Sequence, residues 1–273
     1  MVDPVLVGLA VDKKVKAAGK SVVKAYPTEK VGAFCKRNGR PSVVEYSEIS
    51  EEMANKLRKL KDDEDVKAVV LRVNSPGGSA YGSEQIWYAV SELKKEKPVI
   101  VSMGDYAASG GYYISCNADS IVADPTTLTG SIGIFGMFPN VKGLTDKIGL
   151  SFDVVKTNTY ADFGAMGRPL NDGEKALMQN MVNEGYELFV KRCAEGRGMT
   201  TDEIKKIAEG RVWTGTKAKE LGLVDELGGL DKALEIAIGK AGLDAYTVMS
   251  YPGKKSFFDM LTDTCLLYTS DAA

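Results

Sequence analysis

Val66-Lys-Ala-Val-Val-Leu-Arg-Val-Asn-Ser-Pro-Gly-Gly-Ser79 holds the pattern that decides the fold. Residues 66–73 are mostly β-branched or aliphatic, which predicts a strand that is buried on both faces. A proline–glycine turn follows, and then a helix is predicted over 82–97, where Pro98 stops it. Strands of this kind occur in parallel sheets that are covered by helices. The stretch therefore predicts an α/β fold.

The rest of the chain continues this alternation of strands and helices. A helix is expected over 50–60, with Ser50 as its N-cap. The other elements expected from periodicity and caps are strands over 99–103, 119–124, 131–135 and 152–156, and helices over 172–197, 201–209 and 229–241. The strands 66–73 and 99–103 should lie side by side, both buried, because both are apolar with little interruption.

Domain limits follow from changes in composition along the chain. Residues 50–249 are expected to form the domain, and residues 1–49 to be a junction or a partial upstream segment. Residues 250–273 continue no pattern, and we exclude them from the predicted fold as a tail with the features of a non-native end. The longest early apolar stretch, 4–11, is too short to span a bilayer, so the chain as given is expected to be soluble.

Composition narrows the class of function. The chain has 273 residues, of which 44% are hydrophobic and 26% charged, with a net charge of −2, so we expect no nucleic-acid partner. Its four cysteines lie far apart and form no CxxC pair, so we expect no metal and no cofactor.

The chain contains no histidine, which limits how a serine nucleophile could work. Ser109 lies in Gly104-Asp-Tyr-Ala-Ala-Ser-Gly-Gly-Tyr-Tyr-Ile-Ser115, where a strand, a tight turn and a helix start are predicted. Capping the helix is the simpler interpretation of this serine, but the small residues around it, including Gly110, leave room for a peptide carbonyl. A Ser-His-Asp triad within the chain is impossible, so a lysine or a base from outside must activate Ser109.

Two further segments are weak signals when each is taken alone. Gly77 and Gly78 fit an ordinary turn, or they could direct their amides into a cleft as an oxyanion hole. Ser131, in Thr129-Gly-Ser-Ile-Gly-Ile-Phe135, is by itself a turn serine.

In this order and spacing, the three segments resemble the signal peptide peptidase A (SppA) family of serine peptidases, of the S49 type. The resemblance runs from about residue 50 to about residue 243 and includes Arg211-Val-Trp-Thr-Gly215 and Gly222-Leu-Val-Asp-Glu-Leu-Gly-Gly229. It implies a crotonase/ClpP-like β-β-α spiral, a homo-oligomer and cleavage of peptides, such as signal-peptide remnants, by a Ser/Lys dyad. It also implies a nucleophile at Ser109, an oxyanion and substrate site at Gly77, Gly78 and Gly110, and a lysine-orienting role for Ser131.

One position departs from the family pattern. The lysine of single-copy members matches Ala161 here, and the nearby Lys156 is expected to be solvated at a strand end. Long members carry two related halves, and this chain resembles their carboxy-terminal half, which has the serine. The lysine would then come from a missing amino-terminal half or a neighbouring subunit. Full-length members of the family are associated with the bacterial inner membrane.

Three hypotheses remain open at this point. The first is the catalytic half of a long-form peptidase. The second is a non-catalytic homologue that binds peptides or assembles oligomers, which Ala161 favours and the intact Ser109 disfavours. The third is a crotonase-type enzyme acting on acyl-CoA, against which no paired glutamates lie beside the glycine turn.

Overall fold

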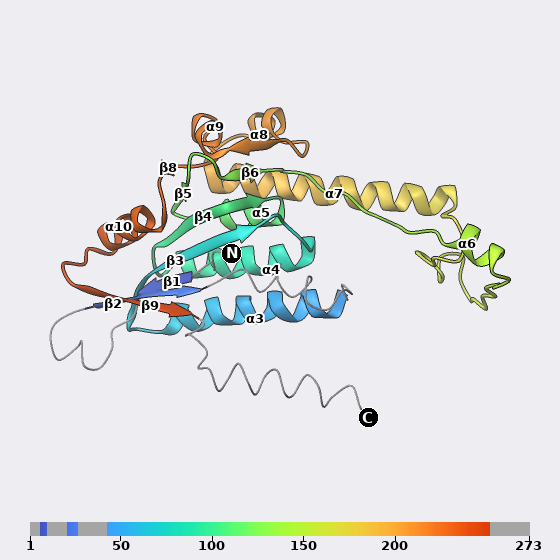
Figure 1. The fold of residues 1–273 in the computed structure, drawn as a ribbon, viewed down its shortest axis with the longest axis horizontal. Coiled ribbons are helices and arrows are strands. Elements are labelled where there is room, and N and C mark those ends of the chain that lie inside the picture. Colours follow the sequence, from blue (N-terminus) through green and yellow to red (C-terminus); the bar gives the residue numbers. More distant parts are fainter. Residues whose placement is uncertain (1–5, 10–20, 27–42, 252–273) are drawn as a thin grey trace, which may run out of the picture.

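The structure is a computed structural model that describes residues 6–9, 21–26 and 43–251 (Figure 1). Its central feature is a mixed sheet in the order β1-β9-β2-β3-β4-β5-β8, with β6 paired to β4 and β7 paired to β6. The strands are β1 (Leu6–Leu9), β2 (Ser21–Tyr26), β3 (Val66–Ser75), β4 (Val99–Ala108), β5 (Ser120–Ala123), β6 (Leu128–Gly130), β7 (Val212–Thr214), β8 (Glu226–Leu227) and β9 (Tyr246–Tyr251).

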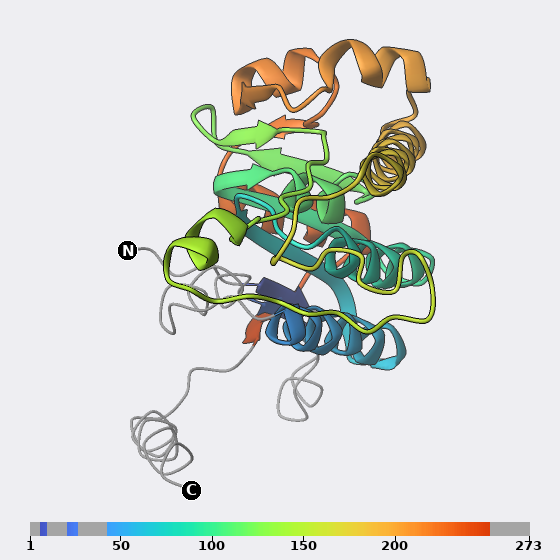
Figure 2. The same cartoon turned by 90° about the vertical axis from the view of Figure 1, so that its right-hand side faces the viewer.

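Helices cover this sheet and extend beyond it. They are α3 (Val43–Asp62), α4 (Ala80–Lys94), α5 (Gly110–Ser115), α6 (Lys142–Lys147), α7 (Asp172–Arg197), α8 (Thr201–Ile207), α9 (Gly215–Glu220) and α10 (Leu230–Ala241). Both views show α3, α4 and α7 running in the same general direction along one side of the sheet, and Figure 2 looks along them. Helix α10 contacts β3, β4 and β5.

The core lies where β3 pairs with β4. The two strands are parallel, with Val69 opposite Val99 and Val73 opposite Met103. Residues 99–103 are all buried, and so are residues 66–73 apart from Lys67 and Arg72. The predicted pairing of two buried strands is confirmed. Because the strands are parallel, their carboxyl ends meet at one edge of the sheet, and the loops that follow them lie together there.

Helix α7 was predicted with its observed limits because both of its ends carry strong signals. Asn171 and Glu174 form a capping box at its start, and Gly198 takes the left-handed conformation after its end, with φ 63°. The predicted strand 119–124 is observed as β5. The helices predicted over 82–97, 201–209 and 229–241 are observed as α4, α8 and α10, and no end is shifted by more than three residues.

The predicted start of one helix and two predicted strands are wrong. Helix α3 begins at Val43, so Ser50 lies inside the helix and is not its N-cap. Residues 131–135 form no strand, because β6 ends at Gly130 and Ser131 takes a positive φ of 49°, which a strand cannot accommodate. Residues 152–156 form no strand either. They are all exposed, so their apolar side chains do not pack on a sheet.

Residues 136–171, which we call the arm, extend past the sheet beside the amino-terminal end of α7 (Figure 1). Its two limbs are joined where Val141 N donates to Met166 O at 2.9 Å. Large apolar side chains are exposed on the arm and beside it: Phe135, Met137, Phe138, Leu144, Ile148, Leu150, Phe152, Val154, Val155, Tyr160 and Met166. Among the described residues, no helix is both long enough and apolar enough to cross a bilayer.

Parts of the predicted junction and tail join the sheet. From residues 1–49 come β1 and β2, which both pair with β3, and β9 ends at Tyr251. The remainder of the tail, with Cys265, lies outside the described residues, as does Cys35. The division into 1–49, 50–249 and 250–273 stays a prediction.

Leu71→Ala should destabilise the fold, because Leu71 is fully buried in β3 and its truncation leaves a cavity in the core. We expect a loss of about 2–5 kcal/mol in the free energy of unfolding, measured by urea denaturation. Leu177→Ala on α7 is the matched control, since that side chain is 43% exposed, and it should cost well under half as much. Equal losses for the two variants would contradict the assignment of β3 to the core.

Candidate active site

Ser109 stands at the junction of β4 and α5. Its amide donates to Gly130 O and its carbonyl accepts from Tyr113 N, both at 2.9 Å. These bonds hold its backbone at φ 52° and ψ −119°, a conformation that is strained for a residue with a Cβ. Its hydroxyl makes no capping bond to α5, so the interpretation as a helix cap fails. The hydroxyl remains available for other chemistry.

Two adjoining cavities meet at Ser109. The smaller, about 140 Å³, we call the side pocket, and Tyr113, Ile134, Phe135 and Phe189 give it a mostly apolar lining. The larger, about 650 Å³, we call the main cleft. Its lining includes Gly77, Gly78, Ser109, Ser131, Tyr186 and Glu209. The prediction that Ser109 faces a cleft is confirmed, and the structure brings Gly77, Gly78 and Ser131 to the same cleft.

The loop after β3 packs against Ser109 at a distance that only glycine allows. A Cβ added at Gly77 would lie 2.7 Å from Ser109 Cβ, and the φ of Gly77 is +112°. A Cβ added at Gly110 would lie 3.1 Å from Gly78 N and 2.6 Å from Ser83 Oγ. The two loops at the carboxyl ends of β3 and β4 are therefore in direct contact.

The amides of this contact differ in their hydrogen bonding. Gly77 N donates to Ser75 Oγ at 3.2 Å, so it is already engaged. The amides of Gly78 and Gly110 donate to no described residue. Of the glycines predicted for the oxyanion site, Gly78 and Gly110 are thus the ones with a free donor beside Ser109.

Ser131 is held in the same way as Ser109. Its amide donates to Arg211 O at 2.7 Å, and its φ is 49°. Glu209, with φ 60°, completes the set of described non-glycine residues with positive φ, and all three line the main cleft. Backbone strain is thus concentrated at one site, as is common in active sites.

Several residues that line the two cavities were not predicted from the sequence as site residues. Tyr113 lies inside the quoted Ser109 segment, so its place in that segment was an available signal. Glu209 precedes the Arg211-Val-Trp-Thr-Gly215 motif, and nothing in its local pattern marks it. Phe189 and Tyr186 follow the helical periodicity of α7, which predicts a packed face and does not distinguish it from a cleft wall.

Ala161, which is predicted to occupy the position of the family lysine, is exposed on the arm and lines neither the side pocket nor the main cleft. Lys156 is exposed as predicted, but it does not lie at a strand end. Its ammonium group is ion-paired with Asp162 at 2.8 Å. Of the described residues that line the two cavities, none is a lysine.

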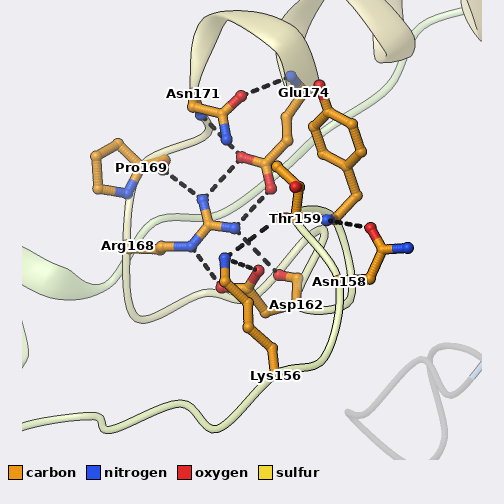
Figure 3. A network of polar contacts seen from close by, with 9 residues as sticks. Lys156, Asn158, Thr159, Asp162, Arg168, Pro169, Asn171 and Glu174 are labelled. Atoms are coloured by element: carbon orange, nitrogen blue, oxygen red, sulfur yellow. Dashed lines mark hydrogen bonds and ion pairs between the residues drawn. The ribbon is translucent and has the colours of Figure 1, made fainter.

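Arg168 clamps the arm to α7 (Figure 3). Its guanidinium donates to Asp162 Oδ2 at 2.8 Å and to the two carboxylate oxygens of Glu174 at 2.7 and 2.5 Å. The Arg168 bonds, with the Asn171 amide, lower the pKa of the buried Glu174 to about 2. Arg168 and Lys156 also lower the pKa of Asp162. The clamp fixes the segment that contains Ala161.

Within the described ranges, no group of three or more His, Cys, Asp or Glu side chains is placed to hold a metal ion. Cys116 and Cys193 are buried free thiols.

Gly77→Ala should disrupt the site, because its Cβ would collide with Ser109 and its φ is unfavourable for alanine. We expect a loss of about 1–3 kcal/mol in the free energy of unfolding. Gly78→Ala is the matched control, since a Cβ there meets nothing within 4 Å, and it should cost less than about 1 kcal/mol. Urea denaturation measures both. If Gly77→Ala is as mild as Gly78→Ala, the close contact of the two loops is not as described.

The clamp should weaken in acid. The pKa of Glu174 is lower in the folded protein than its usual value of 4.5, so its stabilising contribution is present above about pH 4.5 and is lost as the pH falls toward 2. The protection factors of the Asn171 and Glu174 amides, which make the capping box, should fall over that range in hydrogen exchange, after correction for the intrinsic exchange rate at each pH. In Arg168→Gln the exchange should already be fast at pH 6. Equal protection at pH 6 and pH 3 in the unmodified chain would contradict the clamp.

Comparison with known proteins identifies the family. The profile described as "Peptidase family S49" matches residues 91–244. "Protease 4" of Haemophilus influenzae is 47% identical over 68% of this chain and 30% of its own length. A "Putative signal peptide peptidase SppA" of Enterococcus faecium is 36% identical over 74% of this chain and 59% of its own length, and a "Putative protease" of Synechocystis is 38% identical over 69% of each. The chain spans about a third of the length of Protease 4.

Among solved structures, a ClpP1 mutant from Listeria monocytogenes aligns with a TM-score of 0.47 and 17% identity, over 69% of this chain and 88% of that one. The family match and the mixed sheet flanked by helices bear out the predicted α/β fold of the crotonase/ClpP-like class. The predicted resemblance to signal peptide peptidase A is likewise confirmed. The chain belongs to peptidase family S49.

Proposed function

We propose that this chain is the serine-bearing part of a serine endopeptidase of the signal peptide peptidase type, with Ser109 as its nucleophile. The observation that carries the proposal is the free hydroxyl of Ser109, which faces two cavities beside the unengaged amides of Gly78 and Gly110. A strained serine next to two free amide donors has the parts needed for acyl transfer.

The chemistry follows from these groups. Ser109 Oγ attacks the carbonyl carbon of the peptide bond while a base takes the hydroxyl proton. The carbonyl oxygen becomes an oxyanion, which accepts hydrogen bonds from the amides of Gly78 and Gly110. The intermediate collapses, the C–N bond breaks, and the leaving amine takes the proton from the base. Water then hydrolyses the acyl-serine ester by the same route.

The two cavities suit an extended peptide. The apolar lining of the side pocket favours an apolar side chain next to the bond that is cleaved. Its volume of about 140 Å³ is close to that of a dry cavity that admits benzene, about 150 Å³. An apolar residue of moderate size is therefore the expected occupant, as in remnants of signal peptides.

The base is the part that this chain does not supply. The sequence has no histidine, and Ala161 stands at the family lysine position. We assign the base to a lysine from a lysine-bearing amino-terminal half or from a neighbouring subunit of a homo-oligomer. Ser131, which lines the main cleft, would orient that lysine amine.

The arm supports docking of such a partner. Its exposed apolar side chains, among them Met137, Phe152 and Val155, together with the adjoining Phe135, are more numerous than isolated surface residues would explain. Phe135 also lines the side pocket, so the apolar surface begins at the cleft itself. For the full-length protein we propose association with the bacterial inner membrane, as in the family.

The alternative function is a non-catalytic homologue that binds peptides or assembles oligomers. Ala161 favours it, since alanine cannot act as a base. An acyl-CoA enzyme is disfavoured, because Glu209 is the one carboxylate among the described residues that line the main cleft.

Mixing the unmodified chain with a double variant should distinguish the catalytic function from the non-catalytic one. The unmodified chain retains the serine, and Ala161→Lys combined with Ser109→Ala supplies only a lysine. Each alone should hydrolyse an unstructured fluorogenic peptide poorly, and the mixture should be faster by about 10²–10⁴-fold, the usual contribution of a general base. A mixture is the right assay because residue 161 lies outside the cleft of its own chain.

Ala161→Arg with Ser109→Ala is the matched control, because arginine carries the same charge but cannot lose its proton. It should not raise turnover. If the unmodified chain alone reaches the rate of the mixture, the base lies within this chain and the partner is not needed. If no combination is active, the non-catalytic alternative is favoured.

A further inference from the structure

Two buried aromatic residues are part of the lining of the side pocket. Tyr113 on α5 and Phe189 on α7 both line the pocket, and their ring centroids lie 4.6 Å apart. Both residues are buried, so their rings border the pocket on the side of the protein interior.

A single carboxylate bonds to Tyr113. Tyr113 donates its hydroxyl hydrogen to Glu84 Oε2 at 2.5 Å. The other oxygen, Glu84 Oε1, accepts from the Arg192 guanidinium at 2.6 Å. Arg192 in turn stacks on Trp87, with its guanidinium carbon 3.8 Å from the ring centroid. Both oxygens of Glu84 are thereby used, one by a group that lines the pocket.

Glu84 also joins the elements that build the site. It belongs to α4, which follows the Gly77–Gly78 loop, whereas Tyr113 belongs to α5, which begins directly after Ser109. Arg192 lies on α7, one turn from Phe189. Glu84 therefore connects the helix next to the free amides, the helix next to the nucleophile and the helix that forms the pocket wall.

Stability alone does not explain a carboxylate at this place. The Glu84 side chain is 32% exposed, and an ion pair that is only partly buried adds little to folding free energy compared with apolar packing. What a carboxylate provides is direction, because charged hydrogen bonds to a phenol and a guanidinium are short and depend on angle. The arrangement therefore suits a role in orienting a ring.

We propose that Glu84 is a positioning residue that fixes the Tyr113 ring in the lining of the side pocket, and so determines which peptide side chains the pocket accepts. The proposal rests on the proposed function, in that the side pocket takes a side chain of a bound peptide. It adds a residue that does not touch the substrate but acts through Tyr113.

Peptide binding tests this role without requiring catalysis. Two acetylated tetrapeptide amides, identical except for a last residue of leucine or alanine, are titrated into the full chain by isothermal calorimetry. The unmodified chain should bind the leucine peptide at least about tenfold more tightly, since an apolar pocket discriminates by about 10–200-fold per missing group. In Glu84→Ala and in Tyr113→Phe the preference should fall to within about threefold. Glu84→Gln should lie between, because its amide oxygen still accepts from Tyr113.

Tyr112→Phe is the matched control. Tyr112 directly precedes Tyr113 on α5. It is fully buried and donates its hydroxyl hydrogen to Leu223 O at 3.0 Å, but it does not line the side pocket. Loss of the Tyr112 hydroxyl should lower the melting temperature and leave the tenfold preference for the leucine peptide intact. Tyr113→Phe removes one oxygen atom only, so it tests the role even if Glu84→Ala does not fold.

Three results would overturn the proposal: a preference that survives in Tyr113→Phe, a preference lost equally in Tyr112→Phe, or an unmodified chain that binds neither peptide or both alike. The proposed function is judged separately. If the mixed-variant assay shows no Ser109-dependent hydrolysis, the binding ratios still decide the role of Glu84. If hydrolysis is intact and the preference is unaffected by the variants, only the role of Glu84 fails.

Discussion

The contact between the Gly77–Gly78 loop and the Ser109–Gly110 turn is the constraint on which the rest of the site depends. Two backbones approach so closely that a Cβ at Gly77 would lie 2.7 Å from the Cβ of Ser109. This approach is possible because β3 and β4 are parallel neighbours, so both loops leave the sheet at the same edge. The buried pairing of β3 with β4 therefore brings the free amides of Gly78 and Gly110 next to Ser109, the proposed nucleophile.

Backbone strain is a second constraint on the site. Ser109, Ser131 and Glu209 each hold a positive φ although none is glycine. Ser109 donates to Gly130 O, Ser131 donates to Arg211 O, and Gly210, which follows Glu209, donates to Ile132 O. Such conformations persist only where the surroundings determine them fully. The strain is placed around the main cleft, so the site is organised before any peptide arrives.

A strand or helix could be predicted from the sequence where its local pattern of apolar residues agrees with its burial in the structure. The strands β3 and β4 and the helix α7 were predictable because apolar runs and capping residues coincide with the observed core and helix ends. The strands predicted over 131–135 and 152–156 failed for a physical reason. Phe135 and Val155 are apolar but exposed, and a periodic pattern does not distinguish a side chain that meets a core from one that meets solvent or a partner. The Glu84–Tyr113–Arg192 contacts join positions 29 and 108 residues apart, which no local pattern records.

Glu174 has two roles that link the arm to α7. The same carboxylate caps the helix through Asn171 and bonds to the arm through Arg168, so the arm is attached at the first turn of α7. Farther along this 26-residue helix, Val182, Asn183 and Tyr186 form one wall of the main cleft. Glu174 and Tyr186 are separated by about 18 Å of helix, at 1.5 Å per residue. One unbroken helix therefore has the apolar arm attached at its first turn and a wall of the main cleft in its middle.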